Sequence, residues 1–309
     1  MNEFFEQLKD YAGAENVKEK ENMSLHTSFR VGGPADYYVT CENVAVLAQC
    51  IALCKRVEEP YFVMGNGSNL LVNDNGYHGT VLRLKEDGNS IQFKVVGEGE
   101  EAYVLATSSA GNSLSKIGTA AGKLGYAGME FATGIPGSLG GALAMNAGAY
   151  GGEMKDIVTE VVVLTPDGSV KTVSYESLEP SYRNSRLLRE GMIAIAATMK
   201  LSLSTPEEVG TKLKELMDAR RSKQPLDYPS AGSTFKRPEG HFAGKLIQDA
   251  GLSGYRVGGA MVSEKHNGFV INYDHATAED ILGVITDVQK KVYEKFQISL
   301  EMEVKMLGF

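Results

Sequence analysis

The sequence predicts an α+β protein with two domains, and three observations support this fold class. A chain of 309 residues is too long for one ordinary domain but can form two or three, each with its own core. Amphipathic helical segments and alternating, β-branched runs both occur along it. Near residue 203 a strand-like run ends and a strong helix-start signal follows, which indicates a domain boundary.

Strands and helices of the first part can be assigned in order. Residues 158–175 predict a hairpin, because a β-branched run, a Pro-Asp-Gly turn and an alternating run follow one another. Other expected elements here are an N-terminal helix, a β-rich run within 30–41, a helix around Cys50 that ends before Pro60, strands at 61–64, from Leu70, at 81–84, 91–97 and 191–202, and an Ala/Gly-rich helix at 103–125.

The second part begins with a capped helix. Thr205 stands at the N-cap, Pro206 at the first helical position and Glu208 at the capping-box position of a helix that runs to Lys223. A last helix begins at Thr277, and the alternating tail LEMEVKML predicts a strand. We expect domains at 1–203 and 204–309.

Composition and charge narrow the class of protein. Apolar residues make up 43% of the chain and charged residues 23%, as in soluble globular proteins. No apolar run approaches the roughly 20 residues of a membrane span, and no secretion signal opens the chain, so we expect a cytoplasmic protein without a membrane partner. The net charge of −8 argues against nucleic acid as a partner. Nothing in the sequence requires a protein partner, and we expect a monomer.

Cysteine usage fits a reducing compartment. Cys50 and Cys54 lie four residues apart in an apolar helical segment, and Cys41 is the third cysteine. A zinc site would need more ligands, and no histidine lies nearby in the sequence. We therefore expect buried, reduced thiols and no metal site.

Two short glycine motifs compete as phosphate sites. VVGEGEEA at 95–102 fits a dinucleotide pattern, but its three glutamates would repel a pyrophosphate, so we reject it. MGNGSNLLV at 64–72 follows a strand without a helix or lysine after it, so it is neither a Rossmann nor a Walker loop. Its backbone amides, with Gly65 and Gly67 free to adopt positive φ and with Ser68 and Asn69 as donors, would form an anion nest, although a plain loop is the alternative.

Residues 134–152, GIPGSLGGALAMNAGAYGG, contain seven glycines and no charged side chain. A flexible linker would be Ser-rich and polar, whereas this stretch carries apolar residues that require burial, so we expect it to be ordered. Bare backbone lets a flat group approach closely. Together with the anion nest, this wall suits a large planar cofactor with a diphosphate, such as FAD.

Several segments spread over nearly the whole chain form one specific combination. They are TSFRVGGPAD (27–36), GNGSNLLV (65–72), GIPGSLGGALAMNAGAYGGE (134–153), SYRNS (181–185), AGSTFKRP (231–238), AGKLIQDAGLSGYRVGGAMVSEKHNGFVIN (243–272) and LEMEVKMLG (300–308). This combination resembles the UDP-N-acetylenolpyruvoylglucosamine reductase family, flavoenzymes of peptidoglycan precursor synthesis. The resemblance implies a two-lobed FAD-binding domain of the vanillyl-alcohol-oxidase (PCMH) type, with lobes about 22–85 and 86–203, and a smaller α+β substrate-binding domain. The last residues would pack back on the first lobe.

The resemblance also implies the reaction and its catalytic residues. A hydride passes from NADPH to non-covalent FAD and then to the β-carbon of an enolpyruvyl ether, which leaves negative charge to stabilise. Arg183 in SYRNS matches the family's catalytic arginine, which suits a substrate carboxylate, and Ser233 in AGSTF matches its proton donor. In the tail, Glu303 matches the family's catalytic acid because it directly precedes a valine and a basic residue, whereas we expect Glu301 to be a surface residue.

The remaining site residues are expected in two groups. Cofactor contacts are expected at Gly65, Asn66, Gly67, Ser68, Asn69, Leu70, Ile135, Pro136, Gly137, Ser138, Gly141, Asn146 and Gly148. Substrate and NADPH contacts are expected in the locally basic segment, at Lys236, Arg237, Lys245, Gln248, Lys265 and Asn267, with His266 either there or in the core.

One departure and two alternatives stay open. Longer family members carry a loop after the arginine motif with a tyrosine that clamps the nucleotide; here only RLLREG separates SYRNS from the next strand, and Tyr228 and Tyr255 are possible substitutes. An oxidase of the wider flavin family, and a non-catalytic protein that binds flavin or a nucleotide sugar, are the alternative functions.

Overall fold

The computed structural model describes residues 3–309, and the chain divides into two compact units. The first unit contains the N-terminal residues up to Val17, Val39–Asn66 and Val81–Arg220. The second contains Lys18–Tyr38, Gly67–Thr80 and Arg221–Phe309. The predicted division into 1–203 and 204–309 stays a prediction, because these compact units are not unbroken stretches of chain.

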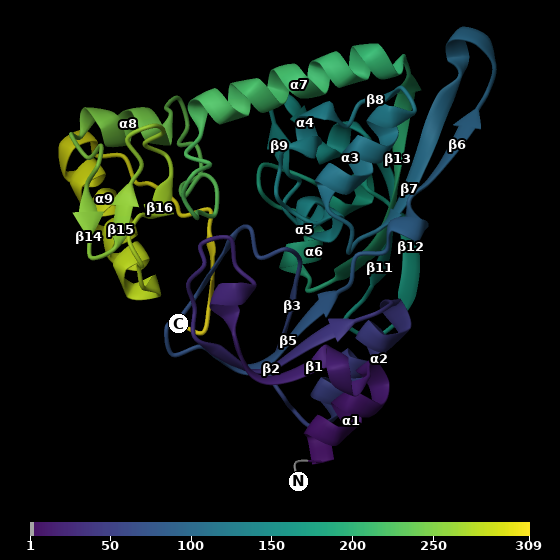
Figure 1. Cartoon of the computed structure of the whole chain (residues 1–309), viewed down its shortest axis with the longest axis horizontal. Helices are drawn as coiled ribbons and strands as arrows, with labels where there is room; N and C mark the ends of the chain where they lie inside the picture. The colour runs from purple at the N-terminus through teal and green to yellow at the C-terminus, as the bar shows by residue number, and fades with distance from the viewer. Residues whose placement is uncertain (1–2) are drawn as a thin grey trace. The chain divides into compact units, whose positions relative to one another are not determined.

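An antiparallel sheet organises the first unit. Its strands follow the order β12-β11-β13-β7-β6, and α3, α4 and α5 lie on one face of it (Figure 1). The predicted hairpin is confirmed, since β11 and β12 pair in register from Glu160 and Ser174 to Leu164 and Val170. The bounds are β6 Gln92–Val96, β7 Tyr103–Ser109, β11 Val158–Leu164, β12 Val170–Ser174 and β13 Ile193–Leu203.

The helix expected at 103–125 is wrong over its first half. Tyr103–Ser109 forms β7, which pairs with β6 and β13, and only Leu114–Lys123 is helical, as α3. Burial alternates along β7, with Val104 and Ala106 buried and their neighbours less so. The pattern therefore has the period of a strand, which the small residues of this segment obscure.

Helices complete the first unit. The predicted cap of α7 is confirmed, because the amide of Glu208 donates to Thr205 Oγ1 at 3.2 Å. Leu213 and Val209 of α7 lie against Gly122 of α3, which holds the two helices together. The helices are α1 Glu3–Ala12, α2 Val44–Arg56, α3 Leu114–Lys123, α4 Glu130–Thr133, α5 Leu139–Ala144, α6 Arg186–Arg189 and α7 Pro206–Lys223; short strands are β3 Tyr61–Met64, β8 Tyr126–Ala127, β9 Gly148–Ala149 and β10 Gly152–Glu153.

Buried cysteines occupy the core of this unit. Cys41, Cys50 and Cys54 are inaccessible to solvent and form no disulfide, so the expectation of buried thiols is confirmed. A hydrogen bond with Cys50, together with burial, raises the pKa of the Cys41 thiol, which keeps it protonated. Among residues 3–309, no helix is long and apolar enough to cross a membrane.

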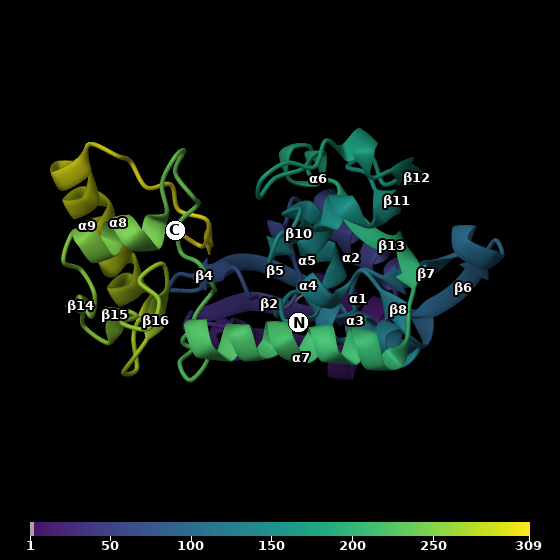
Figure 2. The ribbon, with the colours of Figure 1, turned by 90° about the horizontal axis from the view of Figure 1, so that it is seen from above.

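In the second unit α9 packs across a small antiparallel sheet. The sheet order is β14-β15-β16, and α8 lies next to α9 (Figure 2). Apolar residues of α9 and the sheet, such as Val284, Val288 and Val262, are fully buried in one core with Phe29 and Leu71. The bounds are α8 Ala243–Asp249, β14 Arg256–Val257, β15 Ala260–Val262, β16 Val270–Asn272 and α9 Ala278–Phe296.

Two segments from early in the sequence complete this unit. The strand β4, Leu70–Val72, pairs in parallel with β17, Lys305–Leu307, so the tail is a shorter strand than its alternation predicts. Asp74 caps α9, since both of its carboxylate oxygens accept amide hydrogens from Ala278 and Glu279, at 2.8 and 3.0 Å. The remaining strands of the chain are β1 Val17–Asn22, β2 Pro34–Cys41 and β5 Tyr77–Leu84.

A buried tyrosine provides a test of the first unit. Tyr175 Oη donates to the Leu143 carbonyl at 2.8 Å, and burial raises the pKa of Tyr175. Tyr175→Phe removes this bond and should lower the free energy of unfolding by about 1 kcal/mol in urea titrations. Tyr293→Phe, at a half-exposed position of α9, is the control and should have no effect. Equal stability of all three proteins would contradict this account.

Candidate active site

Close backbone contact joins two predicted cofactor segments within the first unit. At the end of β3, Gly65 lies against Ser138, and a β-carbon added to Gly65 would overlap the Ser138 hydroxyl. The Asn66 side chain donates to the Pro136 carbonyl at 3.5 Å and accepts from Arg83 at 3.3 Å. Glycine is therefore needed at position 65 for close approach. Positive φ, expected for both loop glycines, occurs at Gly67 but not at Gly65.

Residues 134–152 are ordered, as the apolar side chains among them predict. Ser138 caps α5 by accepting the Gly141 amide hydrogen at 3.3 Å. The Gly137 carbonyl accepts from the amide of Leu114 at 3.1 Å, and Leu139 is fully buried. The backbone of the predicted flavin wall is thus fixed from both sides. Ile135 is partly buried, whereas Pro136 is exposed.

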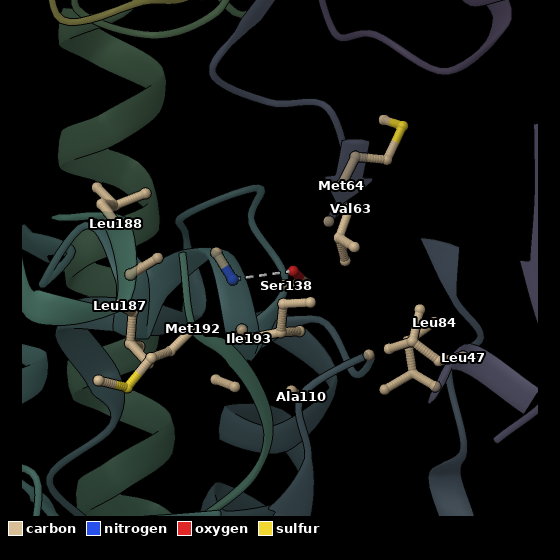
Figure 3. Close-up of a pocket in the computed structure, with 16 residues that line it drawn as sticks. Leu47, Val63, Met64, Leu84, Ala110, Ser138, Leu187, Leu188, Met192 and Ile193 are labelled. Atoms are coloured by element: carbon tan, nitrogen blue, oxygen red, sulfur yellow. Dashed lines mark hydrogen bonds between the residues drawn. The ribbon is translucent and has the colours of Figure 1, made fainter. Parts of the chain in front are cut away.

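A pocket opens beside these two segments. It holds about 660 Å³ of empty space, part of which is open solvent at its mouth. Figure 3 shows the Ser138 hydroxyl on one wall, Val63 and Met64 above it, and leucines on opposite sides. None of the described residues that line it is charged. The pocket therefore offers an uncharged surface next to the two predicted cofactor segments.

Arg183 sits on a strained loop that the glycine-rich stretch holds. Its φ is +55°, a left-handed conformation that costs a residue with a side chain of order 1 kcal/mol or more. The Arg183 guanidinium donates to the Gly148 carbonyl at 3.3 Å. Ser185 is fully buried, and its hydroxyl donates to the Ala144 carbonyl at 2.8 Å. The loop conformation therefore fixes where the arginine side chain begins.

Asn146 connects the same loop to Glu153. Its amide group donates to Glu153 at 3.0 Å and to the Ser181 carbonyl at 3.4 Å, while its oxygen accepts from the Lys155 amide at 2.9 Å. Lys155, with Asn146 and the charge of Arg183 in support, lowers the pKa of Glu153 and keeps it ionised. Asn146 is fully buried and each atom of its amide has a protein partner, so it anchors this site.

In the second unit Ser233 and Glu303 lie on adjacent backbone segments. Thr234, next to Ser233, accepts the amide hydrogen of Glu303 at its carbonyl at 2.8 Å. Phe235 and Met302 form an antiparallel bridge. Ser233 is exposed and follows Gly232, whose φ is +76°. The structure thus brings the predicted proton donor and the predicted acid together.

Asn69 extends this cluster to the nucleotide loop. Its side chain donates to the Glu303 carbonyl at 3.1 Å, and its own carbonyl accepts from the Lys305 amide at 3.0 Å. Gly67 accepts the Ser28 amide hydrogen at its carbonyl, Ser68 is partly buried and Leu70 is buried in β4. Asn69 therefore holds the backbone that follows the Glu303 side chain, while Thr234 holds the amide that precedes it.

Most predicted substrate contacts already have partners in the second unit. Lys236 forms an ion pair with Glu301. Glu301 is exposed, as the sequence predicts. Lys245 pairs with Asp249 at 2.6 Å within α8, where Gln248 is exposed.

Other predicted binding residues contact their own surroundings. Lys265 donates to the Arg221 carbonyl at 2.6 Å, and the Asn267 amide donates to Ser253 and to the Ser263 carbonyl. Arg237 lies over the Phe242 ring, at 4.6 Å from its centre.

Histidine and tyrosine candidates differ in their surroundings. Burial lowers the pKa of His266, which accepts the Gly268 amide hydrogen and contacts Phe269, so a core role describes it best. The Tyr255 hydroxyl donates to Asp287 at 2.6 Å. Tyr228 is exposed and stacks on Tyr273 at 5.3 Å.

Sequence reasoning missed three residues that hold the site. Glu153, Ser185 and Thr234 all lie within or next to the motifs GAYGG, SYRNS and AGSTF. Each of them is a polar residue in a glycine-rich or turn segment, and only the structure shows its partners.

Comparison with known proteins defines the class. A family model described as an FAD binding domain matches residues 35–174. A second, described as the C-terminal domain of UDP-N-acetylenolpyruvoylglucosamine reductase, matches residues 224–307. The chain is thus a flavoprotein oxidoreductase with FAD as its cofactor.

Relatives identify the family. The chain is 50% identical over 307 residues to UDP-N-acetylenolpyruvoylglucosamine reductase of Lachnoclostridium phytofermentans, covering 99% of this chain and 98% of the relative. It is 46% identical over 306 residues to that of Clostridium tetani, covering 99% and 97%. The crystal structure of the Thermus caldophilus reductase matches with a TM-score of 0.78 and 34% identity, over 94% of this chain and 99% of that one. The chain belongs to the UDP-N-acetylenolpyruvoylglucosamine reductase family.

These findings confirm the predicted resemblance, the α+β fold class with an FAD-binding domain, and the cofactor FAD. The individual roles of the site residues stay predictions.

The Gly65 contact provides a direct test. Gly65→Ala should lower the free energy of unfolding by about 1–3 kcal/mol, because the added methyl meets Ser138. Urea titrations measure this loss. Gly210→Ala is the matched control, since nothing lies within 4 Å of that position. Wild-type stability of Gly65→Ala would contradict the close contact between Gly65 and Ser138.

Proposed function

We propose that this protein is an NADPH-dependent reductase that converts UDP-N-acetylglucosamine enolpyruvate to UDP-N-acetylmuramate. The observation that carries the proposal is the cluster of Asn69, Ser233 and Glu303 segments in the second unit, joined by hydrogen bonds of the Glu303 backbone to Thr234 and Asn69. The 50% identity to a reductase of this name over nearly the whole chain supports it. We further propose that the protein acts as a cytoplasmic monomer.

FAD, when bound, supplies a carrier that accepts a hydride from NADPH and delivers it to the substrate β-carbon. The residues proposed to hold it are those around Gly65 and Ser138 in the first unit, with Gly67 and Ser68 as part of the loop. Their bare backbone and the uncharged pocket beside them fit such a group. Asn66 and Asn69 hold the loop rather than serve as free donors.

Arg183 is proposed to bind the carboxylate of the enolpyruvyl group. Its planar, cationic guanidinium can donate two parallel hydrogen bonds to a carboxylate. The strained loop conformation limits the positions that the side chain can reach. Binding by Arg183 therefore orients the double bond and stabilises the charge that develops beside it.

Ser233 and Glu303 are proposed to handle the proton and the charge. Ser233 Oγ holds the proton that goes to the α-carbon, and the exposed position of its side chain leaves it open to substrate. Glu303 is the acid that holds the developing charge, and its backbone is fixed by Thr234 and Asn69. Such positioning is what proton transfer over a single hydrogen bond requires.

Basic residues of the second unit are proposed to bind the phosphates of both nucleotides in turn. Lys236 and Lys245 pair with exposed carboxylates, and such pairs are weak enough to exchange for a phosphate. Arg237, Gln248, Lys265 and Asn267 complete the proposed group.

Ser233→Ala separates the two half-reactions. The variant should keep flavin reduction by NADPH near the wild-type rate and should slow reoxidation by the enolpyruvyl substrate by ~10²–10⁴-fold, because only the second step needs the proton. Stopped-flow absorbance of the flavin measures both rates. Ser202→Ala, an exposed serine of β13, is the control. An equal loss in both half-reactions would show that Ser233 holds the cofactor or the fold instead.

Glu303 and Glu301 form a matched pair in the tail. Glu303→Gln should lower kcat by ~10²-fold or more without loss of bound flavin, since it removes the acid but keeps the strand. Glu301→Gln removes an equal charge two residues away and should keep kcat. Steady-state kinetics on both variants measures this, and an equal effect on kcat would refute the assignment of Glu303.

A further inference from the structure

Arg183 lies at the tip of a two-residue turn in the first unit. The amide of Ser181 donates to the Asn184 carbonyl at 2.9 Å, and the amide of Asn184 donates back to the Ser181 carbonyl at 3.2 Å. These paired bonds form an antiparallel bridge with only Tyr182 and Arg183 between its ends. The turn therefore fixes where the side chains of both tip residues begin.

Position 183 is an unusual place for an arginine. Its φ is +55°, and a residue with positive φ in a tight turn is usually glycine or asparagine. The strained backbone sets the origin of the side chain, but a long arginine side chain keeps many rotamers beyond that point. A guanidinium that must meet a carboxylate therefore needs further contacts to hold it.

Contacts from two segments hold the Arg183 guanidinium. Its Cζ lies 5.1 Å from the centre of the Tyr182 ring, within the roughly 6 Å of a cation–π interaction. One of its amino groups donates to the Gly148 carbonyl at 3.3 Å. Glu153, which is paired with Gly148 across β9 and β10, attracts the same cation by its charge. The Tyr182 ring thus adds an attraction from the turn to those from the glycine-rich stretch.

Tyr182 contributes little to the core of the first unit. It is 46% exposed, whereas Ser185 in the same loop is fully buried. Substitutions at exposed positions usually change stability only slightly. A change of the Tyr182 ring should therefore leave the fold intact and act on the guanidinium beside it.

We propose that Tyr182 is a positioning residue for Arg183, and that its ring holds the guanidinium in the orientation that receives the substrate carboxylate. The inference rests on the proposed function, in which Arg183 binds the carboxylate of the enolpyruvyl group. The ring attracts the cation as a whole and needs no hydrogen bond from it, so paired hydrogen bonds to a carboxylate can still form. The aromatic ring carries this role, and the hydroxyl group does not.

Tyr182→Leu and Tyr182→Phe test the proposal, because leucine removes the ring and phenylalanine keeps it. Oxidised, FAD-loaded protein is titrated calorimetrically with UDP-N-acetylglucosamine enolpyruvate and with UDP-N-acetylglucosamine, which has no enolpyruvyl carboxylate. Tyr182→Leu should bind the first nucleotide about 3- to 10-fold more weakly and the second with wild-type affinity. Tyr182→Phe should bind both with wild-type affinity.

Two results of these titrations would overturn the proposal. Equal weakening for both nucleotides in Tyr182→Leu would show that the tyrosine contacts the nucleotide part instead, and wild-type affinity for both would show that the ring has no role. Tyr293→Leu, at a tyrosine of α9 that is 49% exposed, is the control and should change neither affinity.

Crystal structures of the substrate-free variants measure the placement of Arg183 directly. Arg183 should keep its hydrogen bond to the Gly148 carbonyl in Tyr182→Phe and lose it in Tyr182→Leu, while both variants melt at the wild-type temperature. The same Arg183 position in both variants would contradict the proposal. Failure of the wild type to reduce the enolpyruvyl nucleotide counts against the proposed function alone, because these structures contain no substrate.

Discussion

Hydrogen bonds between Asn69 and the C-terminal strand are the constraint on which the proposed chemistry depends. The side chain of Asn69 holds the Glu303 carbonyl and its backbone holds the Lys305 amide, while β4 pairs with β17 in parallel. Thr234 then binds the Glu303 amide from the other side, next to Ser233. Segments more than 160 residues apart in sequence thus meet through two backbone hydrogen bonds and one from the short side chain of Asn69.

The first unit depends on glycines, whose lack of a side chain permits close backbone contacts. Gly65 approaches Ser138 so closely that no β-carbon fits, and Ser138 in turn caps α5. From the end of α5 the chain holds the Arg183 loop through Ser185 and Asn146. Ordering these glycines costs conformational entropy on folding. In return, one short stretch forms the predicted flavin wall and fixes the loop of the predicted catalytic arginine.

Local signals predicted most elements, and non-local contacts explain what the sequence did not show. The hairpin at 158–175 and the cap at Thr205 depend on neighbouring residues, so the sequence predicts them directly. The segment at 103–109 is a strand because it finds partners in β6 and β13, which its small residues do not reveal. Resemblance to a family selected Arg183, Ser233 and Glu303, yet the partners of Asn69 and Asn146 follow only from the fold.

Anaerobic reoxidation of the reduced wild-type protein tests the central claim most directly. The flavin is reduced with one equivalent of NADPH and then mixed with UDP-N-acetylglucosamine enolpyruvate, while absorbance and product are followed. The account predicts rapid return of the oxidised flavin spectrum with one equivalent of UDP-N-acetylmuramate, and only slow reoxidation by air. Fast reoxidation by oxygen with no response to the enolpyruvyl nucleotide would instead indicate an oxidase. A protein that binds the nucleotide and flavin without turnover would contradict the enzymatic account altogether.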